Sequence, residues 1–266
     1  KTSRTGFSTP LGQRIIPIDS IDSTNDYIIQ YPFLPSGTIV IARSQRKGKG
    51  QKDRKWISNV GGLYFSFKLV FPQETNISQS KVFWIQSALS ISICKALKNT
   101  GLNPTLKWPN DIMVFGKKIG GILGESKIGN QGMVIFLGLG LNIENNLNEI
   151  ITEFPELNGK ISSVKKELIL LGKQPSEENL IINTFQETIF YMDTYWNSNF
   201  PLDVLKNEWL SFSNIINKSI KFKDLEKHFF EATVNDITDY GSLLVTTSNK
   251  EKKELTVGEI EFLEKN

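Results

Sequence analysis

The chain has 266 residues and a formal net charge of +3, with one cysteine and one histidine. Its length fits one large domain, or a large domain and a small one. With Cys94 alone, the chain has no internal disulfide or thiolate metal cage, and His228 alone excludes a multi-histidine metal site. Residues 43–55 carry +6, so the rest of the chain sums to −3. Such local positive charge suits a small polyanion better than a long nucleic-acid duplex.

No segment approaches the roughly 18 apolar residues that a membrane-spanning helix needs. The first residues, KTSRTGFSTP, also lack the apolar region of a signal peptide. We therefore expect a soluble, cytoplasmic protein with no membrane partner. Cys94 lies in an apolar helical pattern, which predicts a small core residue in a reducing compartment. His228 lies in the strand-like run HFFEATV and is expected to be a structural or surface histidine.

The N-terminal elements are predicted from hydrophobic patterns. Residues 14–30 begin as a short strand and become a helix, for which Ser23 is a good N-cap with Asp26 three residues later. Residues 37–43, GTIVIAR, form the short β-branched run that is typical of a buried strand. In residues 61–71, GGLYFSFKLVF, large apolar side chains at 63, 65, 67 and 69 alternate with Tyr64, Ser66 and Lys68. This period of two predicts a half-buried strand.

The middle of the chain predicts one long helix followed by three strands. Apolar residues recur at helical spacing over residues 81–101, which indicates the main core helix. Strand patterns follow at 106–116, 117–129 and 131–143, separated by glycine-containing turns. Consecutive strands joined by tight turns favour an antiparallel or mixed sheet.

The last part of the chain predicts helices and then a small β domain. Helical patterns cover 163–171, 176–196 and 203–210, and four or five short strands follow. Short strands in such number indicate a small β-barrel. The predicted fold class is therefore α+β: a mixed, largely antiparallel central sheet with helices, plus the barrel. The predicted domains are residues 1–213 and 214–266.

The basic loop, SQRKGKGQKDRKW at residues 44–56, contains neither a P-loop nor a dinucleotide-binding glycine motif. Its glycines would let backbone amides approach an anion, and its cations would neutralise the charge. The residues concerned are Gly48, Gly50, Lys47, Lys49, Lys52 and Arg54. Trp56 adds an indole that can stack on a purine. A solvated surface loop is the alternative, and composition alone does not separate the two.

The motif KWPND, at residues 107–111, places an ammonium, an indole, an amide and a carboxylate within a short predicted strand. Pro109 removes a ladder donor, so a proline-bulged edge strand with a polar turn is one explanation. That explanation leaves open why Asn110 and Asp111 interrupt an otherwise buried strand, where unpaired polar groups are costly. A hairpin would bring Lys118 near the motif and put a cation and a carboxylate in one pocket.

With these motifs the sequence resembles the biotin protein ligases, the biotin–[acetyl-CoA-carboxylase] ligase family, from about residue 16 through the C-terminal barrel. The matching stretches are IDSTN (21–25), SQRKGKGQKDRKW (44–56), GGLYFS (61–66), KWPNDI (107–112), K-x-x-G-I-L-x-E (118–125) and GLGLNI (138–143). KWPND followed by K-x-x-G-I-L, with D-S-T-N upstream, is the specific part of this pattern. The resemblance implies an SH3-like fold for the C-terminal barrel.

The reaction that the resemblance implies is a two-step ligation. The carboxylate of biotin attacks the α-phosphate of Mg-ATP to give biotinyl-5′-AMP and pyrophosphate. The ε-amine of a specific lysine on a biotin carboxyl carrier protein domain then attacks the mixed anhydride. Biotin and ATP with Mg²⁺ are therefore the expected substrates, no metal site is expected on the chain, and the protein would be a monomer or a homodimer.

The same resemblance assigns roles to individual residues. The biotin pocket would be lined by Ser23, Thr24, Asn25, Gln45, Lys49, Gly50, Gln51 and Lys118. The nucleotide side would use Gly48, Lys52, Arg54, Trp56, Lys107, Asn110 and Asn142. The catalytic residues would be Lys118, Asp111 and Lys49.

Physical reasoning agrees with these roles. Two anions must meet in the first step, so the site needs cations, and Lys118 and the basic loop supply them. In the second step an amine with a pKa near 10.4 is mostly protonated, so a carboxylate that accepts or orients its proton would help. Asp111 is the candidate for this role, and a structural role in holding Lys118 or Lys107 is the alternative.

The basic loop departs from the family's G-R-G-R pattern. Lys49 and Gln51 stand in place of arginines, and Asp53 in place of a glycine. Lysine lacks the bidentate fork of arginine and glutamine carries no charge, so we predict weaker retention of biotinyl-5′-AMP. Only about 15 residues precede the first predicted strand. We therefore expect the ligase-only form, without the N-terminal DNA-binding domain that some members carry, and no DNA partner.

Two other functions remain as alternatives. A lipoate or octanoyl ligase or transferase of related fold is opposed by KWPND. A non-enzymatic nucleic-acid-binding module would use the basic loop and the barrel. The barrel segment gives this reading little support, because it mixes Lys with Glu and has few aromatic residues at strand centres.

Overall fold

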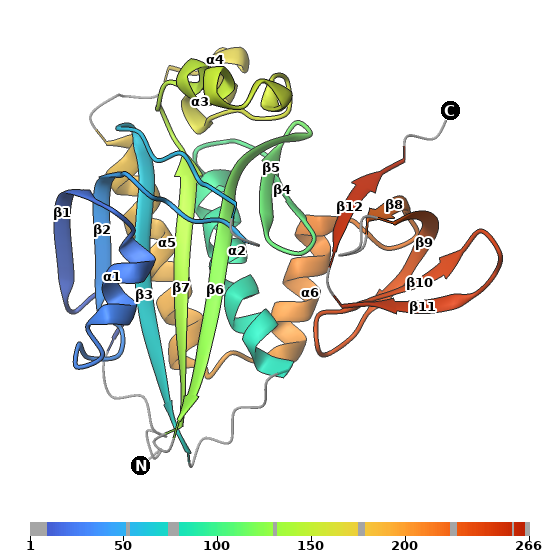
Figure 1. Ribbon diagram of the computed structural model, residues 1–266, viewed down its shortest axis with the longest axis horizontal. Helices are drawn as coiled ribbons and strands as arrows, with labels where there is room; N and C mark the ends of the chain where they lie inside the picture. Colours follow the sequence, from blue (N-terminus) through green and yellow to red (C-terminus); the bar gives the residue numbers. More distant parts are fainter. Residues whose placement is uncertain are drawn as a thin grey trace.

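The computed structural model of the chain consists of a large sheet backed by helices and a smaller sheet beside it (Figure 1). It describes residues 10–51, 54–73, 80–129, 132–174, 179–223, 228–256 and 258–263. Among the helices in those ranges, none is long and apolar enough to cross a membrane. The predicted α+β class is confirmed.

The large sheet has seven strands in the order β1-β2-β3-β7-β6-β5-β4. β1 and β2 are parallel, whereas the other neighbouring pairs are antiparallel, so the sheet is mixed and largely antiparallel as predicted. The strands are β1 (Ile15–Ile21), β2 (Ile39–Gln45), β3 (Gly62–Pro72), β4 (Pro104–Lys107), β5 (Asp111–Val114), β6 (Lys117–Gly129) and β7 (Gly132–Asn142).

The helices divide between the two faces of this sheet. α1 packs on one face, and α2 and α5 pack on the other (Figure 1). The helices are α1 (Thr24–Gln30), α2 (Ser80–Asn99), α3 (Leu147–Glu153), α4 (Val164–Leu170), α5 (Leu180–Asn197) and α6 (Leu202–Ser213), with a 3-10 turn η2 (Pro155–Leu157). The predicted core position of Cys94, in α2, is confirmed because the side chain is fully buried.

The prediction that β3 is half-buried is wrong. Phe65 and Phe67 face the helical core, where Phe65 meets Phe185 of α5 edge to face. Ser66 and Lys68, on the opposite face, are buried as well. The alternation along β3 therefore separates an apolar face from a polar face that α1 and a cavity cover, and it does not mark exposure to solvent.

The predicted strand at 106–116 is also wrong. It is a hairpin, in which β4 and β5 pair antiparallel, with Lys107 opposite Asp111. The turn consists of Trp108, Pro109 and Asn110, and the Trp108–Pro109 peptide is cis. Asn110 therefore lies at a hairpin turn and Asp111 begins a strand, which removes the puzzle of polar residues inside a buried strand.

The second sheet is five-stranded and antiparallel, in the order β11-β10-β9-β8-β12. Its strands are β8 (Ser219–Lys223), β9 (Phe229–Ile237), β10 (Leu243–Thr247), β11 (Lys252–Leu255) and β12 (Glu259–Phe262). His228 is exposed just before β9, as predicted for a surface histidine. That residues 1–213 and 214–266 are separate domains stays a prediction.

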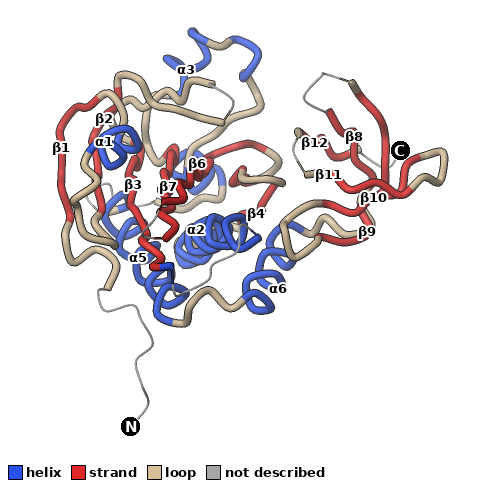
Figure 2. The backbone as a smooth tube through the Cα atoms, turned by 60° about the horizontal axis from the view of Figure 1, so that its bottom comes forward, coloured by secondary structure: helices blue, strands red, loops and turns tan. Residues whose placement is uncertain are grey.

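Two tryptophans, Trp84 of α2 and Trp108 of the β4–β5 turn, link the first part of the chain to the turn between β9 and β10. Nε1 of Trp84 donates to the carbonyl of Asp239 at 2.8 Å, and Nε1 of Trp108 donates to the carbonyl of Gly241 at 2.9 Å. Both indoles are buried, and one apolar cluster runs from α2 into the second sheet. In Figure 2, α6 lies between α2 and this sheet. The KWPND hairpin is thus packed directly against the C-terminal part of the chain.

Candidate active site

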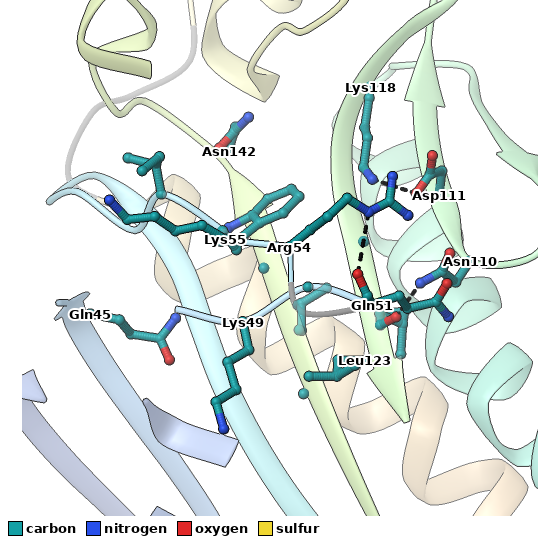
Figure 3. A pocket seen from close by; sticks show the side chains of 18 of the residues that line it. Gln45, Lys49, Gln51, Arg54, Lys55, Asn110, Asp111, Lys118, Leu123 and Asn142 are labelled. Atoms are coloured by element: carbon teal, nitrogen blue, oxygen red, sulfur yellow. Dashed lines mark hydrogen bonds and ion pairs between the residues drawn. The ribbon is translucent and has the colours of Figure 1, made fainter. Parts of the chain in front are cut away.

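A cavity of about 400 Å³ opens on the face of the large sheet that carries α1. Its walls come from the start of α1, the segment between β2 and β3, the β5–β6 hairpin, β7 and the α3–η2 region. Figure 3 shows the side chains that point into it. Segments far apart in the sequence therefore meet at one concave site.

The floor of the cavity is made of glycines on adjacent strands. Gly138 and Gly140 lie on β7, and Gly121 lies opposite Gly140 on β6. A Cβ at Gly138 would be 3.1 Å from Oγ of Ser66, and a Cβ at Gly140 would overlap the indole Nε1 of Trp56. These positions carry no side chain of their own, so a flat group can lie directly on the sheet, as the indole of Trp56 does at Gly140.

One end of the cavity is polar and internally hydrogen-bonded. Oε1 of Gln45 accepts from the backbone N–H of Thr24 at 2.8 Å, and Nε2 of Gln45 donates to Oγ of Ser58 at 2.8 Å. Oγ of Ser23 accepts from the amide of Asp26, which confirms the predicted N-cap of α1. The cap fixes the first turn of α1, which carries Thr24 into this end.

Asn25 provides an open acceptor at the polar end. Its Nδ2 donates to Glu125, but its buried Oδ1 has no hydrogen-bond partner within the described chain. The Cβ position of Gly138 is 3.4 Å from this oxygen, so the oxygen faces the glycine floor. An unpaired buried carbonyl oxygen is costly, and a ligand N–H placed here would satisfy it.

The other end of the cavity carries charge. Nζ of Lys118 lies 2.5 Å from Oδ1 of Asp111, as the hairpin prediction anticipated. The β5–β6 ladder shifts register between Ile112 and Met113. Such a bulge re-aims neighbouring side chains, and here it lies next to the residues that pair with Lys118 and Gly120. Figure 3 shows Lys118 and Asp111 pointing toward each other at this end.

Trp56 lies between the two ends. Its ring is 5.5 Å from Nζ of Lys118, a cation–π distance, and it covers the floor at Gly140. Its Nε1 is buried without a hydrogen-bond partner in the described residues. The indole therefore occupies part of the cavity itself, and its predicted contact with adenine stays a prediction.

The five cations of the basic loop that the structure describes are paired with carboxylates. Arg46 and Lys47 both contact Asp22, and their hydrogen bonds hold the pKa of Asp22 below its ordinary value. The other pairs are Lys49 with Asp26, Arg54 with Glu259, and Lys55 with Glu153. In Figure 3 the amine of Lys49 points away from Lys118. These exposed pairs are weak, so a phosphate could replace the carboxylates.

The cavity brings together most of the predicted site residues. These are Ser23, Thr24, Asn25, Gln45, Lys49, Gly50, Gln51, Arg54, Trp56, Asn110, Asp111, Lys118 and Asn142. Lys107 pairs across the hairpin and does not line the cavity, and Lys52 lies outside the described residues. Gly48 does not line it either. A Cβ at Gly48 would overlap the carbonyl of Trp56, so the lack of a side chain at Gly48 allows the two ends of the loop to lie against each other.

Two parts of the cavity wall, its roof and its glycine floor, were not predicted from the sequence. The roof is the α3–η2 region with the segment after it, and its lining residues are Ile150, Phe154, Glu156, Leu157 and Ile161. α3 has only seven residues, too few for a clear helical period. The floor has a signal in the sequence, the alternating glycines of GLGLNI, because glycines two apart fall on one face of a strand.

In the described part of the chain, no group of three His, Cys, Asp or Glu side chains is placed to hold a metal ion. Asp111 is the acidic side chain nearest to Lys118 among the cavity residues, and it is engaged by that lysine.

Two family sequence models match the chain, one after the other. The Biotin/lipoate A/B protein ligase family matches residues 18–142, and the Biotin protein ligase C terminal domain matches residues 215–263. The first description covers biotin and lipoate enzymes, whereas the second names biotin protein ligases alone. The chain belongs to the biotin protein ligase family. It is therefore a ligase of the biotin class, and the recognition from its motifs is confirmed.

Individual relatives agree with this assignment. The bifunctional ligase/repressor BirA of Bacillus subtilis is 26% identical over 256 residues, which cover 94% of this ligase and 75% of the relative. The biotin protein ligase of Aquifex aeolicus, solved with biotin and ATP, has a TM-score of 0.71 at 23% identity and covers 95% of this chain and 100% of that one. The Leishmania major enzyme, solved with biotinyl-5-AMP, has a TM-score of 0.59 at 17% identity and covers 92% and 99%.

Proposed function

We propose that this ligase activates biotin with ATP and transfers it to a lysine of a biotin carboxyl carrier domain in the cytoplasm. In the first step a carboxylate oxygen of biotin bonds to the α-phosphorus, and pyrophosphate leaves with the electron pair. In the second step the lysine amine bonds to the acyl carbon, AMP leaves, and the amine loses a proton. Mg²⁺ belongs to the ATP substrate in this scheme.

The observation that carries the proposal is the contrast between the two ends of the cavity. The polar end has an unpaired buried acceptor, Oδ1 of Asn25, which suits an N–H of the ureido ring of biotin. The other end has Lys118 and Asp111 beside the basic loop, which suits the carboxylate and phosphate. Between them lies the glycine floor. A ligand with a neutral ring at one end and an acid at the other matches this order.

Lys118 has the central role in the proposed chemistry. Negative charge builds on the phosphate oxygens as the carboxylate attacks, and a fixed ammonium stabilises it. The contact with Asp111 holds the ammonium at the cavity until a phosphate competes for it. In the second step Asp111 accepts or orients the proton of the incoming amine.

The roles of the remaining residues follow their places in the cavity. Thr24 and Gln45 would hold the ureido end, where they already share a hydrogen bond. Trp56 would cover adenine, and Asn110 and Asn142 would contact the nucleotide. Lys49 would leave Asp26 for the carboxylate–phosphate junction, because an exposed ion pair resists such exchange by about 1 kcal/mol or less.

The test is isotope exchange between pyrophosphate and ATP, measured with biotin, with lipoate and without either acid. We expect exchange that requires biotin and that Lys118→Ala slows by about 100-fold or more. Exchange with lipoate in preference to biotin would assign the chain to the related transferases. No exchange with either acid, combined with salt-sensitive binding of oligonucleotides, would favour the nucleic-acid-binding alternative.

A further inference from the structure

Glu167, in the first turn of α4, is a buried carboxylate that does not line the cavity. Its side chain is 2% exposed. Burying a carboxylate is unfavourable unless hydrogen bonds and a cation compensate it. Oγ of Ser162 donates to Oε1 of Glu167, and Nζ of Lys117 lies 3.6 Å from the same oxygen. Glu167 therefore joins the loop before α4 to the start of β6.

The loop that Glu167 holds runs along the backbone of Lys118. The amide of Lys118 donates to the carbonyl of Lys160 at 2.9 Å, and the amide of Ser162 donates to the carbonyl of Lys118 at 2.9 Å. Ile161 and Lys118 form an isolated parallel bridge. Both backbone polar groups of Lys118 are thus bonded to residues 160–162.

The same loop also holds a second cavity residue. Nδ2 of Asn142, at the end of β7, donates to the carbonyl of Ser162 at 3.2 Å, and Oδ1 of Asn142 accepts from Asn145. β7 pairs with β6 only from Gly120 onward, so residues 160–162 take its place beside Lys118. Residues 160–162 therefore hold both the side-chain amide of Asn142 and the backbone that carries the ammonium of Lys118, at the end of the cavity proposed for the nucleotide.

Successive residues of β6 direct these contacts to opposite faces of the sheet. Lys117 turns toward Glu167, and Lys118 turns toward Asp111 and the cavity. The ladder bulge lies next to this pair of lysines, so β5 alone does not fix the direction of Lys118. Without the Glu167 anchor, the backbone of Lys118 would be held in the sheet mainly by its pairing with Met113 of β5, next to the bulge.

We propose that Glu167 is a positioning residue of the ligase reaction, which acts by anchoring Ser162 and Lys117 and so aims Lys118 at the reacting phosphate. This inference rests on the proposed role of Lys118 in adenylation. It assigns to a buried residue outside the cavity an effect on catalytic rate. A misplacement of a reacting group by about 1 Å can cost about 100-fold in rate, so loss of the anchor is measurable.

The first comparison uses Glu167→Gln and a matched control. Glu167→Gln keeps the size and an acceptor oxygen for Ser162 but loses the charge that faces Lys117. Glu208→Gln is the control. Glu208 of α6 also pairs with a lysine, Lys95 of α2, at 2.8 Å in a half-buried cluster, and this pair lies on the side of the large sheet that faces away from the cavity. We expect both variants to unfold at lower temperature, and only Glu167→Gln to slow biotin-dependent pyrophosphate exchange, by about 10-fold.

The pattern of kinetic constants separates positioning from general loosening of the fold. For Glu167→Gln we expect kcat to fall while KM for biotin changes less than about twofold, because the polar end is untouched. Ser162→Ala removes one hydrogen bond to the carboxylate and should give a smaller fall of the same kind. Because it leaves Glu167 in place, Ser162→Ala also keeps the test available if substitutions of Glu167 itself do not fold.

The deciding experiment is a double-mutant cycle with Lys118→Ala. If Glu167 acts through Lys118, the loss from Glu167→Gln should shrink to less than about twofold in the Lys118→Ala background. An equal loss in both backgrounds, or an equal loss from Glu208→Gln, would overturn the positioning role. An unimpaired Lys118→Ala enzyme would contradict the proposed role of Lys118, on which this inference rests, whereas an inactive wild-type protein would contradict the proposed function itself. An impaired Lys118→Ala enzyme with an unimpaired Glu167→Gln enzyme would contradict only the positioning role.

Discussion

Nζ of Lys118 lies 2.5 Å from Oδ1 of Asp111, across the β5–β6 hairpin and at one end of the cavity. Both side chains are partly buried, so the pair is stronger than an exposed one. The carboxylate of Asp111 thus engages the same ammonium that the proposed mechanism directs at the phosphate. In the proposed mechanism Asp111 would therefore hold Lys118 in position before it acts on the proton of the incoming amine.

Replacing Asp111 by asparagine tests that relationship. The amide keeps the shape but no longer attracts the ammonium, so Lys118 should lose its position and both steps should slow, by about 10-fold or more. Single-turnover measurements of biotinyl-5′-AMP formation and of transfer from purified adenylate separate the steps. A normal first step with a slow second step would show that Asp111 acts only on the amine proton.

Gln51 lines the cavity, and its carbonyl accepts from Nε of Arg54 at 3.2 Å. Gln51→Arg would add a cation near the phosphate, and a hydrogen bond to a charged group is worth about 1.5–3 kcal/mol. We expect the dissociation of biotinyl-5′-AMP to slow by about 10-fold or more. Gln51→Met, of similar length and without charge, is the control, and an unchanged rate in Gln51→Arg would refute this account of the loop.

The glycine floor predicts a size limit at Gly140. In Gly140→Ala the new Cβ would overlap the indole of Trp56, so the ring must leave the floor and KM for ATP should rise by about 10-fold or more. Gly129→Ala is the control, because a Cβ there, at the end of β6, meets nothing within 4 Å among the residues that the structure describes. Equal KM values for the two variants would mean that the floor does not place Trp56.

Tyr195 predicts a loss of stability at alkaline pH. Burial, together with its hydrogen bond to Glu208, raises the pKa of Tyr195 above the ordinary value of 10.0. Above pH 10.0 the unfolded chain loses this proton while the folded chain keeps it, so the free energy of unfolding falls as pH rises. In Tyr195→Phe this fall should be shallower, as urea unfolding at pH values below and above 10.0 would show. An equal slope in both proteins would contradict the assignment.

Three other buried groups also contribute to that pH profile. Burial raises the pKa of Tyr64 and that of the Cys94 thiol, and both act in the same direction as Tyr195. Desolvation lowers the pKa of Lys68, so its contribution rises with pH until the ordinary value of 10.5 is reached. The wild-type slope therefore combines opposing effects, and the difference between wild type and Tyr195→Phe isolates one of them.

The sequence predicts the elements that have a clear hydrophobic period or a specific motif. The long helix α2, the strands β2 and β7 and the meeting of Asp111 with Lys118 all follow from local patterns. The roof of the cavity does not, because α3 and η2 are short and reach the cavity only through the tertiary fold. The role proposed for Glu167 also depends on tertiary contacts that no spacing in the sequence reveals.

The basic loop shows the same limit for electrostatics. Its composition predicts an anion site, yet Arg54 and Lys55 meet Glu259 and Glu153, which lie far along the chain. A sequence pattern reports the local excess of charge but not the partners that folding supplies. The described cations of the loop are thus already paired with carboxylates, and in the proposed function the ligand would exchange with those carboxylates.

The most direct test of the account is ATP-dependent transfer of biotin to a purified biotin carboxyl carrier domain, followed by intact-mass measurement. We expect the wild-type ligase to add one biotin to a single lysine of the carrier, and Lys118→Ala to slow this transfer by about 100-fold or more. Absence of transfer by the wild-type protein, with biotin, ATP and Mg²⁺ present, would contradict the proposed function.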